Sequence, residues 1–252
     1  MTKIPKIIHY CWFGGNPYPT KIKKYIETWH KFLPNYKFVL WNEDNFNIEN
    51  SCQYVIDAYK EKKYAFVSDY VRLYALYQYG GIYLDTDIEM IKAIPPEVLC
   101  DELVFSLDDG GYIAGSFIAS TANNQVIGKL IETYNFLSFY NDDGSLNIEV
   151  NNTYIQKKLI ELGYKYQQIN RLQRLKDEIV LYPDDYFHCR SLTTGKINIS
   201  ENSVAIHWHS ILWASTKTKF INFIRINLLV PIMGRKLYSS ITNKIKNGKT
   251  TI

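Results

Sequence analysis

The stretch AFVSDYVRLYALYQYGGIYLDTDIE, residues 65–89, decides the fold of this chain. Its first part predicts a helix over residues 63–79, and apolar side chains in nearly every direction around the axis predict that this helix is buried. Gly80-Gly81 ends the helix, because glycine adopts a left-handed cap at little cost. The apolar run after it predicts a strand over Ile82–Asp85. A buried helix leading into a buried strand indicates the centre of an α/β sheet.

Two aspartates, Asp85 and Asp87, come at the end of this strand. If the strand continues, alternation puts both on one side, about 6.6 Å apart at their Cα atoms. Paired carboxylates at that spacing suit Mg²⁺ or Mn²⁺, which keep part of their coordination sphere for substrate phosphates. The alternative is that both residues are ordinary turn or helix-cap residues. Their position after a buried strand favours the metal site.

Asp69 and Arg72 are the charged residues that interrupt the buried helix. Their i,i+3 spacing puts them on one helix face, where they can form an ion pair. Charges in a buried helix need partners or a polar ligand. A structural ion pair and a ligand-binding pair therefore remain equally open from these residues alone.

Strands and helices alternate on both sides of this stretch. Expected strands cover residues 4–11, 36–41, 82–85, 103–107, 115–120, 180–182 and 204–207, and expected helices cover residues 21–32, 63–79, 124–139 and 153–162. This alternation predicts an α/β fold with a mixed, mainly parallel central sheet that binds ligands at the carboxyl ends of its strands.

Composition excludes several classes of protein. The chain has 252 residues, a formal charge of +4 and four scattered cysteines without a CxxC pair, which argues against a disulfide scaffold and favours a reducing cytoplasm. No apolar run approaches the roughly 20 residues that span a bilayer, and the start lacks the pattern of a signal peptide. The sequence has no P-loop, no GxGxxG helix start, no HExxH and no GxSxG, and its basic residues form no broad patch for nucleic acid.

A late segment, Ala205-Ile206-His207-Trp208-His209-Ser210, gathers two of the five histidines. As a strand it sends His207 and His209 to one side. One interpretation is a metal ligand beside an aromatic that stacks on sugar; the other is two histidines packed at the edge of the core. Elsewhere in the chain, Asp108 and Asp109 stand beside glycines after an expected strand. They are candidates to position an acceptor substrate or are plain turn residues.

Residues 4–15, 65–87 and 205–213 together resemble glycosyltransferase family 32, which includes yeast initiating mannosyltransferases and bacterial capsule and lipopolysaccharide enzymes. The central block also resembles the catalytic domain of the large clostridial glucosylating toxins. The resemblance implies a GT-A, Rossmann-like domain over residues 1–215 that binds a nucleoside diphosphate sugar. Relatives often carry serine where this chain has Leu212, so the chain departs from the family pattern where the third metal ligand is expected.

The resemblance also implies roles for individual residues. It assigns donor contacts to Tyr10, Trp12, Ser68, Asp69, Arg72, Tyr83, Asp85 and Trp213, metal ligation to Asp85, Asp87 and His207, and catalysis to Asp69, Arg72, Asp85 and Asp87. The metal and the arginine then stabilise the charge that develops on the departing diphosphate.

The function expected from these roles is retaining, Mn²⁺- or Mg²⁺-dependent transfer of a hexose or N-acetylhexosamine. By resemblance the donor is a UDP-sugar, and the acceptor is a saccharide or lipid-linked saccharide in capsule, exopolysaccharide or lipopolysaccharide synthesis. The alternative is a protein on the same fold that binds carbohydrate or nucleotide sugar without catalysis. A hydrolase is disfavoured, because glycosidase carboxylates usually come from separate elements.

Residues 216–252 form an expected amphipathic, basic, helical extension. Leu237, Ile241 and Ile245 recur at helical spacing beside lysines, which suits peripheral contact with an anionic membrane on its cytoplasmic face. A helix packed on the domain with a solvated basic face is the alternative.

Overall fold

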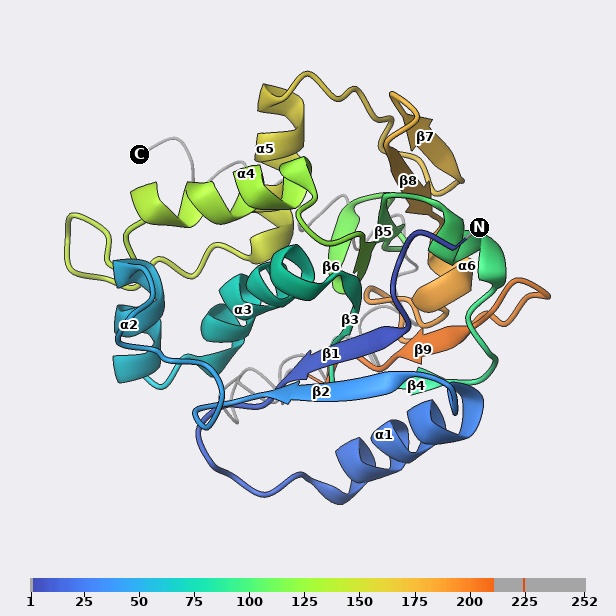
Figure 1. The fold of residues 1–252 in the computed structure, drawn as a ribbon, viewed down its shortest axis with the longest axis horizontal. Helices are drawn as coiled ribbons and strands as arrows, with labels where there is room; N and C mark the ends of the chain where they lie inside the picture. The colour runs from blue at the N-terminus through green and yellow to red at the C-terminus, as the bar shows by residue number, and fades with distance from the viewer. Residues whose placement is uncertain (1, 211–223, 225–252) are drawn as a thin grey trace.

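A seven-stranded sheet organises the protein in a computed structural model that describes residues 2–210 and Ile224. Its strands are β1 (Ile7–Cys11), β2 (Lys37–Trp41), β3 (Gly81–Leu84), β5 (Leu103–Leu107), β6 (Ile113–Ser120), β7 (Gln173–Leu175) and β8 (Ile179–Tyr182). They lie in the order β2-β1-β3-β6-β5-β8-β7 (Figure 1). The pairings make β2, β1, β3, β5 and β8 run in one direction, with β6 and β7 reversed. The expected mixed, mainly parallel sheet is confirmed.

Helices cover both faces of this sheet (Figure 1). The α-helices are α1 (Thr20–Phe32), α2 (Gln53–Lys60), α3 (Tyr64–Tyr79), α4 (Gln125–Thr133), α5 (Asn151–Glu161) and α6 (Asp184–Phe187), with 3-10 turns η1 (Pro96–Cys100) and η2 (Tyr134–Phe136). Because side chains alternate along β3, they contribute to two hydrophobic cores on opposite faces of the sheet. Tyr83 belongs to the core shared with α2 to α5, and Ile82 and Leu84 belong to the core shared with α1 and α6. The β3 strand is therefore buried on both faces, as its continuous apolar sequence predicts.

The join between α3 and β3 requires glycine. Gly80 has a φ of +62° and its amide donates to the Leu76 carbonyl, which ends the helix. A Cβ on Gly81 would lie 2.6 Å from the Ile7 carbonyl oxygen of β1. The helix ends at Gly80 as expected, but with a ψ of −171° rather than in the left-handed helical conformation expected for the cap. The second glycine lets β3 approach β1 closely.

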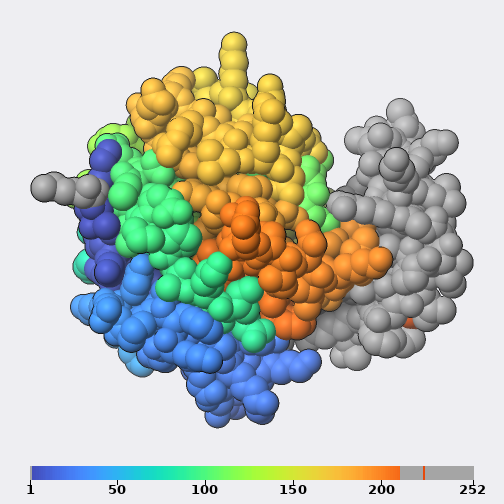
Figure 2. All heavy atoms as spheres, turned by 90° about the vertical axis from the view of Figure 1, so that its right-hand side faces the viewer, coloured from blue at the N-terminus to red at the C-terminus, as the bar shows by residue number. Residues whose placement is uncertain are grey.

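A second, two-stranded sheet carries the late histidine segment. Strand β4 (Ile88–Met90) pairs antiparallel with β9 (Ala205–His207), so that Ile88 lies opposite His207. Figure 2 shows this late segment, in orange, lying against the green segment that follows the third strand. The pairing brings residues about 120 positions apart to one place, directly after the two aspartates.

Three expectations fall wholly or partly outside the described residues: the domain boundary at 215/216, the amphipathic extension over 216–252, and Trp213. The helix expected over residues 124–139 is shorter than predicted, because α4 ends at Thr133 and continues only as the η2 turn. In the described part of the chain, no helix is long and apolar enough to cross a membrane.

Candidate active site

The two aspartates lie in a turn, and the expectation that the strand continues through them is wrong. Strand β3 ends at Leu84, and the Ile88 amide donates to the Asp85 carbonyl at 3.1 Å as the chain reverses into β4. The turn still brings the side chains together: one ligand atom from each of Asp85, Asp87 and His207 lies within 4.8 Å of the others. The pairing of β4 with β9 supplies the histidine.

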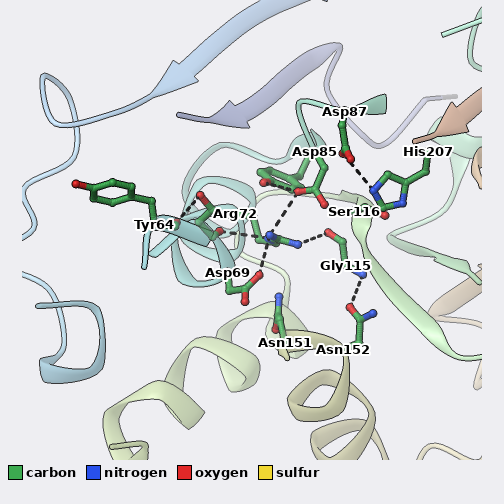
Figure 3. A network of polar contacts seen from close by, with 12 residues as sticks. Tyr64, Asp69, Arg72, Asp85, Asp87, Gly115, Ser116, Asn151, Asn152 and His207 are labelled. Atoms are coloured by element: carbon green, nitrogen blue, oxygen red, sulfur yellow. Dashed lines mark hydrogen bonds and ion pairs between the residues drawn. The ribbon is translucent and has the colours of Figure 1, made fainter. Parts of the chain in front are cut away.

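Arg72 connects helix α3 to this turn (Figure 3). Its guanidinium lies 2.7 Å from an Asp69 carboxylate oxygen and 3.4 Å from Asp85, and it donates to the Gly115 carbonyl at 2.7 Å. The Arg72 side chain is only 7% exposed. Asp69 and Arg72 therefore do form a buried ion pair, and the same arginine also faces the DXD turn.

Tyr83 holds both Asp85 and Arg72 in position. Its hydroxyl donates to Asp85 at 2.9 Å, and the Arg72 guanidinium lies 4.6 Å from the centre of its ring. Burial raises the pKa of Asp69 to about 6; Arg72 opposes that shift and Asp85 adds to it. Ionised Asp69 therefore depends on the nearby positive charge of Arg72.

Asp87 is tied to the late segment by side chain and backbone. His207 Nε2 lies 3.2 Å from its carboxylate, the Trp208 amide donates to its carbonyl, and the Ser210 amide donates to its carboxylate. Burial opposes ionisation of Asp87, but His207 and these hydrogen bonds outweigh it and hold the pKa of Asp87 well below its usual range. Asp87 is accordingly an anion beside His207.

Two further histidines contact His207, of which sequence reasoning missed one. His188, just after α6, approaches the His207 ring with centroids 4.9 Å apart, and His209 approaches it at 4.0 Å. Strand β9 ends at His207, and His209 has a φ of +52°. A backbone bend, not strand alternation, therefore brings His207 and His209 together.

A cavity of about 700 Å³ opens over this cluster. Of the expected site residues, those that line it are Trp12, Ser68, Asp69, Arg72, Tyr83, Asp85, Asp87 and His207. Tyr10 is not brought to the cavity: it packs edge-on against Trp29 at 5.3 Å on the other face of the sheet. The volume is in the range of small-molecule and cofactor sites.

The first loop and the first turn of α5 supply other walls. The Trp12 indole donates to the Asn16 carbonyl at 2.6 Å and its ring lies 4.7 Å from that of Tyr18. Asn152 accepts a hydrogen bond from the Gly115 amide at 2.8 Å. The buried Asn151 Nδ2 has no hydrogen-bond partner in the described part of the chain. Sequence reasoning missed Asn151 and Asn152 as site residues. The signal that could have found them is their position directly before the expected start of a helix at Thr153.

The acidic turn after β5 has a structural explanation. Asp108 accepts hydrogen bonds from the amides of Gly110 at 2.8 Å and Tyr112 at 3.0 Å, which stabilises its own turn. Ser191 donates to Asp109. Asp108 nevertheless lines the cavity, so its turn role and an acceptor role are compatible.

Known proteins resemble the part of the chain that contains Asp69, Arg72 and the two aspartates of the DXD turn. Residues 19–105 match the family model described as "Glycosyltransferase sugar-binding region containing DXD motif". Inositol phosphoceramide mannosyltransferase 3 of Schizosaccharomyces pombe is 33% identical over 96 residues, 37% of this chain and 27% of that protein. An uncharacterized glycosyltransferase of Acanthamoeba polyphaga mimivirus, L373, is 37% identical over 90 residues, 34% of this chain and 36% of that protein. The chain thus spans about a third or less of these curated relatives.

A solved structure shares the fold. The PaToxG glycosyltransferase aligns with a TM-score of 0.51 and 22% identity over 63% of this chain and 69% of that one. This likeness supports the expected GT-A arrangement of sheet and helices. Residues 19–105 therefore carry the likeness of this chain to glycosyltransferases that have a sugar-binding region with a DXD motif.

Proposed function

We propose that this protein transfers a sugar from a nucleoside diphosphate sugar, with a divalent cation held by Asp85, Asp87 and His207. The observation that carries the proposal is the convergence of these three side chains with Arg72 on one wall of the 700 Å³ cavity. The cavity also presents the Trp12 ring, and aromatic faces suit bases and sugars. The donor is by resemblance a uridine diphosphate sugar of a hexose or N-acetylhexosamine.

The residues present fit a cation. Two carboxylates and one imidazole match the ligands of Mn²⁺ or Mg²⁺, and His207 Nε2 lies 3.2 Å from an Asp87 carboxylate oxygen, so both side chains can face one cation. When bound, such a cation neutralises phosphate oxygens and stabilises a diphosphate leaving group.

Charge balance supports dependence on that cation. Asp69, Asp85 and Asp87 carry up to three negative charges at neutral pH, against one positive charge on Arg72 and one on His207 when it is protonated. The excess is two negative charges with His207 neutral (3 − 1 = 2) and one with His207 protonated (3 − 2 = 1), and in either state it repels a diphosphate and attracts a divalent cation. Arg72 is already engaged by two carboxylates, so it cannot by itself hold the donor.

The protein's own residues orient the reaction. Asp69 and Tyr83 hold the guanidinium of Arg72 beside Asp85, on the cavity wall. Asn151 lines the same cavity, and within the described residues its buried Nδ2 has no hydrogen-bond partner. Retention of the anomeric configuration follows if the acceptor hydroxyl attacks on the face from which the diphosphate leaves. The hydroxyl gives its proton to that diphosphate, so this mechanism requires no second carboxylate.

The proposal has three further parts. The acceptor is a saccharide or a lipid-linked saccharide, and the pathway is capsule, exopolysaccharide or lipopolysaccharide synthesis. The protein attaches peripherally to the cytoplasmic face of a membrane. The alternative, a non-catalytic binder of nucleotide sugar, would retain the cavity and need no turnover.

The direct test is release of nucleoside diphosphate from a panel of UDP- and GDP-sugars, with and without Mn²⁺, because slow donor hydrolysis needs no known acceptor. The comparison is between wild type, Asp87→Asn and the control Asp142→Asn, an exposed carboxylate in the 141–145 turn. We expect metal-dependent turnover in wild type and Asp142→Asn, reduced by about 10²-fold or more in Asp87→Asn. Donor binding without turnover in all three proteins would favour the non-catalytic binder.

A further inference from the structure

Three of the five histidines of the chain meet beside the DXD turn. One ring nitrogen from each of His188, His207 and His209 lies within 4.8 Å of the others. Their ring centroids are 4.9, 4.0 and 6.1 Å apart. The three side chains come from the end of α6, from β9 and from the bend after it, so their meeting is a product of the fold.

The hydrogen bonds of these rings all use the same nitrogen. His209 Nε2 lies 3.1 Å from the Arg190 carbonyl, which can only accept, so Nε2 carries the proton and Nδ1 keeps a lone pair. His207 Nε2 faces the Asp87 carboxylate at 3.2 Å, with the same consequence. His188 Nε2 lies 2.9 Å from the hydroxyls of Ser106 and Ser116.

The opposite nitrogens are left over. Among the residues that the structure describes, the buried His188 Nδ1 and His207 Nδ1 have no hydrogen-bond partner, and His188 is only 2% exposed. A buried polar atom without a partner costs about 1–3 kcal/mol. His209 adds the strain of a left-handed backbone conformation, which persists where the surrounding structure requires it. Packing alone explains neither the unpartnered nitrogens nor the strained bend.

We propose that His188, His207 and His209 form a second metal site, through their Nδ1 atoms, for a borderline divalent transition metal such as Zn²⁺. Neutral imidazoles suit Zn²⁺, whereas the oxygen-rich set of Asp85 and Asp87 suits Mn²⁺ or Mg²⁺. Partners that hold the second nitrogen of each ring are the usual surroundings of histidine ligands. Here the second nitrogen of His188 is held by Ser106 and Ser116. That of His207 is held by Asp87, and that of His209 by the Arg190 carbonyl.

His207 couples the two sites. Binding of Zn²⁺ at its Nδ1 leaves the proton on Nε2, where it stays hydrogen-bonded to Asp87. Ligation of a cation at the DXD site through Nε2 requires this proton to move, and while Zn²⁺ occupies Nδ1 the proton cannot shift to that nitrogen and would have to leave to solvent. Zn²⁺ at the three-histidine site therefore weakens binding of Mn²⁺ at the DXD site, and Mn²⁺ weakens binding of Zn²⁺ by the same factor.

The test is calorimetric titration of the full chain with Zn²⁺ alone, in the Asp85→Asn background that disables the oxygen-rich site. No donor is present, so its failure leaves the proposed transferase function untouched. We expect one equivalent of Zn²⁺ to bind, and binding to weaken by about tenfold or more when His209→Gln is added. His209 is partly exposed and the variant is expected to fold, which circular dichroism checks. The control His30→Gln removes a histidine that packs on Phe38, away from the cluster, and should leave Zn²⁺ affinity unchanged.

Titration with Co²⁺ gives a second reading, because a low-symmetry nitrogen site produces visible absorption bands. These bands should appear in Asp85→Asn and disappear with His209→Gln. Absence of Zn²⁺ binding in Asp85→Asn, or an affinity unaffected by His209→Gln, would overturn the proposal and leave the three rings as packing residues.

Discussion

Replacing Arg72 by methionine should destabilise the protein far more than replacing an exposed arginine of an equally close ion pair. Arg72 is 7% exposed, lies 2.7 Å from Asp69 and 3.4 Å from Asp85, and donates to the Gly115 carbonyl. Removing one partner of a buried pair leaves an uncompensated charge, which costs about 3–5 kcal/mol. Arg174 also lies 2.8 Å from a carboxylate, that of Asp101, but is 52% exposed, and Arg174→Met should cost less than about 1 kcal/mol.

Urea unfolding at pH 7.5, followed by tryptophan fluorescence, measures both losses. Adding Asp69→Asn to Arg72→Met should recover at least about 1 kcal/mol, because it removes the buried charge that the arginine had balanced. The double variant keeps the shape of the site while it changes its charge. Equal losses for Arg72→Met and Arg174→Met, or no recovery with Asp69→Asn, would refute the view that Arg72 chiefly compensates buried carboxylates.

Three further changes test other parts of the structure. Mn²⁺ at about 100 times its dissociation constant should raise the unfolding free energy of wild type by about 2.7 kcal/mol and should leave Asp87→Asn nearly unchanged in thermal melts; equal stabilisation would exclude Asp87 as a ligand. Burial lowers the pKa of His9 from 6.5 to about 4. Between pH 7 and pH 5 the imidazole is therefore protonated in the unfolded chain but stays neutral in the folded protein. This difference should lower the free energy of unfolding by about 2 kcal/mol from pH 7 to pH 5. Urea unfolding should show that much less acid loss in His9→Gln, and identical losses would contradict the assignment. A Cβ at Gly115 would lie 2.9 Å from Arg72 Nη1, so Gly115→Ala should lower donor turnover by about tenfold with a loss of only about 1–2 kcal/mol in stability; unchanged turnover would show that the position of Arg72 does not limit the reaction.

The centre of the fold was predictable because its signals are local. Helix α3, the cap at Gly80 and strand β3 follow from one continuous stretch in which burial, glycine and apolar runs agree. The same stretch contains both aspartates of the DXD turn. What local sequence could not give is the end of β3, since an apolar run followed by Asp-Thr-Asp fits both a longer strand and a turn.

The rest of the site depends on contacts between distant segments. Strands β4 and β9 have three residues each, too few for a recognisable alternation, yet their pairing delivers His207 to Asp87. His188 becomes part of the cluster only because Ser106 and Ser116, from β5 and β6, meet the end of α6. Tyr10 lies in β1, where alternation turns it to the face opposite Cys11, whereas Trp12 follows the strand and reaches the cavity.

The central claim is that a diphosphate enters this site only with a divalent cation held by the DXD turn. Calorimetric titration of UDP and GDP into wild type and Asp87→Asn, each with Mn²⁺ and with chelator, measures it directly. We expect the favoured nucleotide to bind wild type at least about tenfold more tightly with Mn²⁺, because the site otherwise holds excess negative charge, and we expect Mn²⁺ to make no difference in Asp87→Asn. Equal affinity with and without Mn²⁺ in wild type would contradict the account.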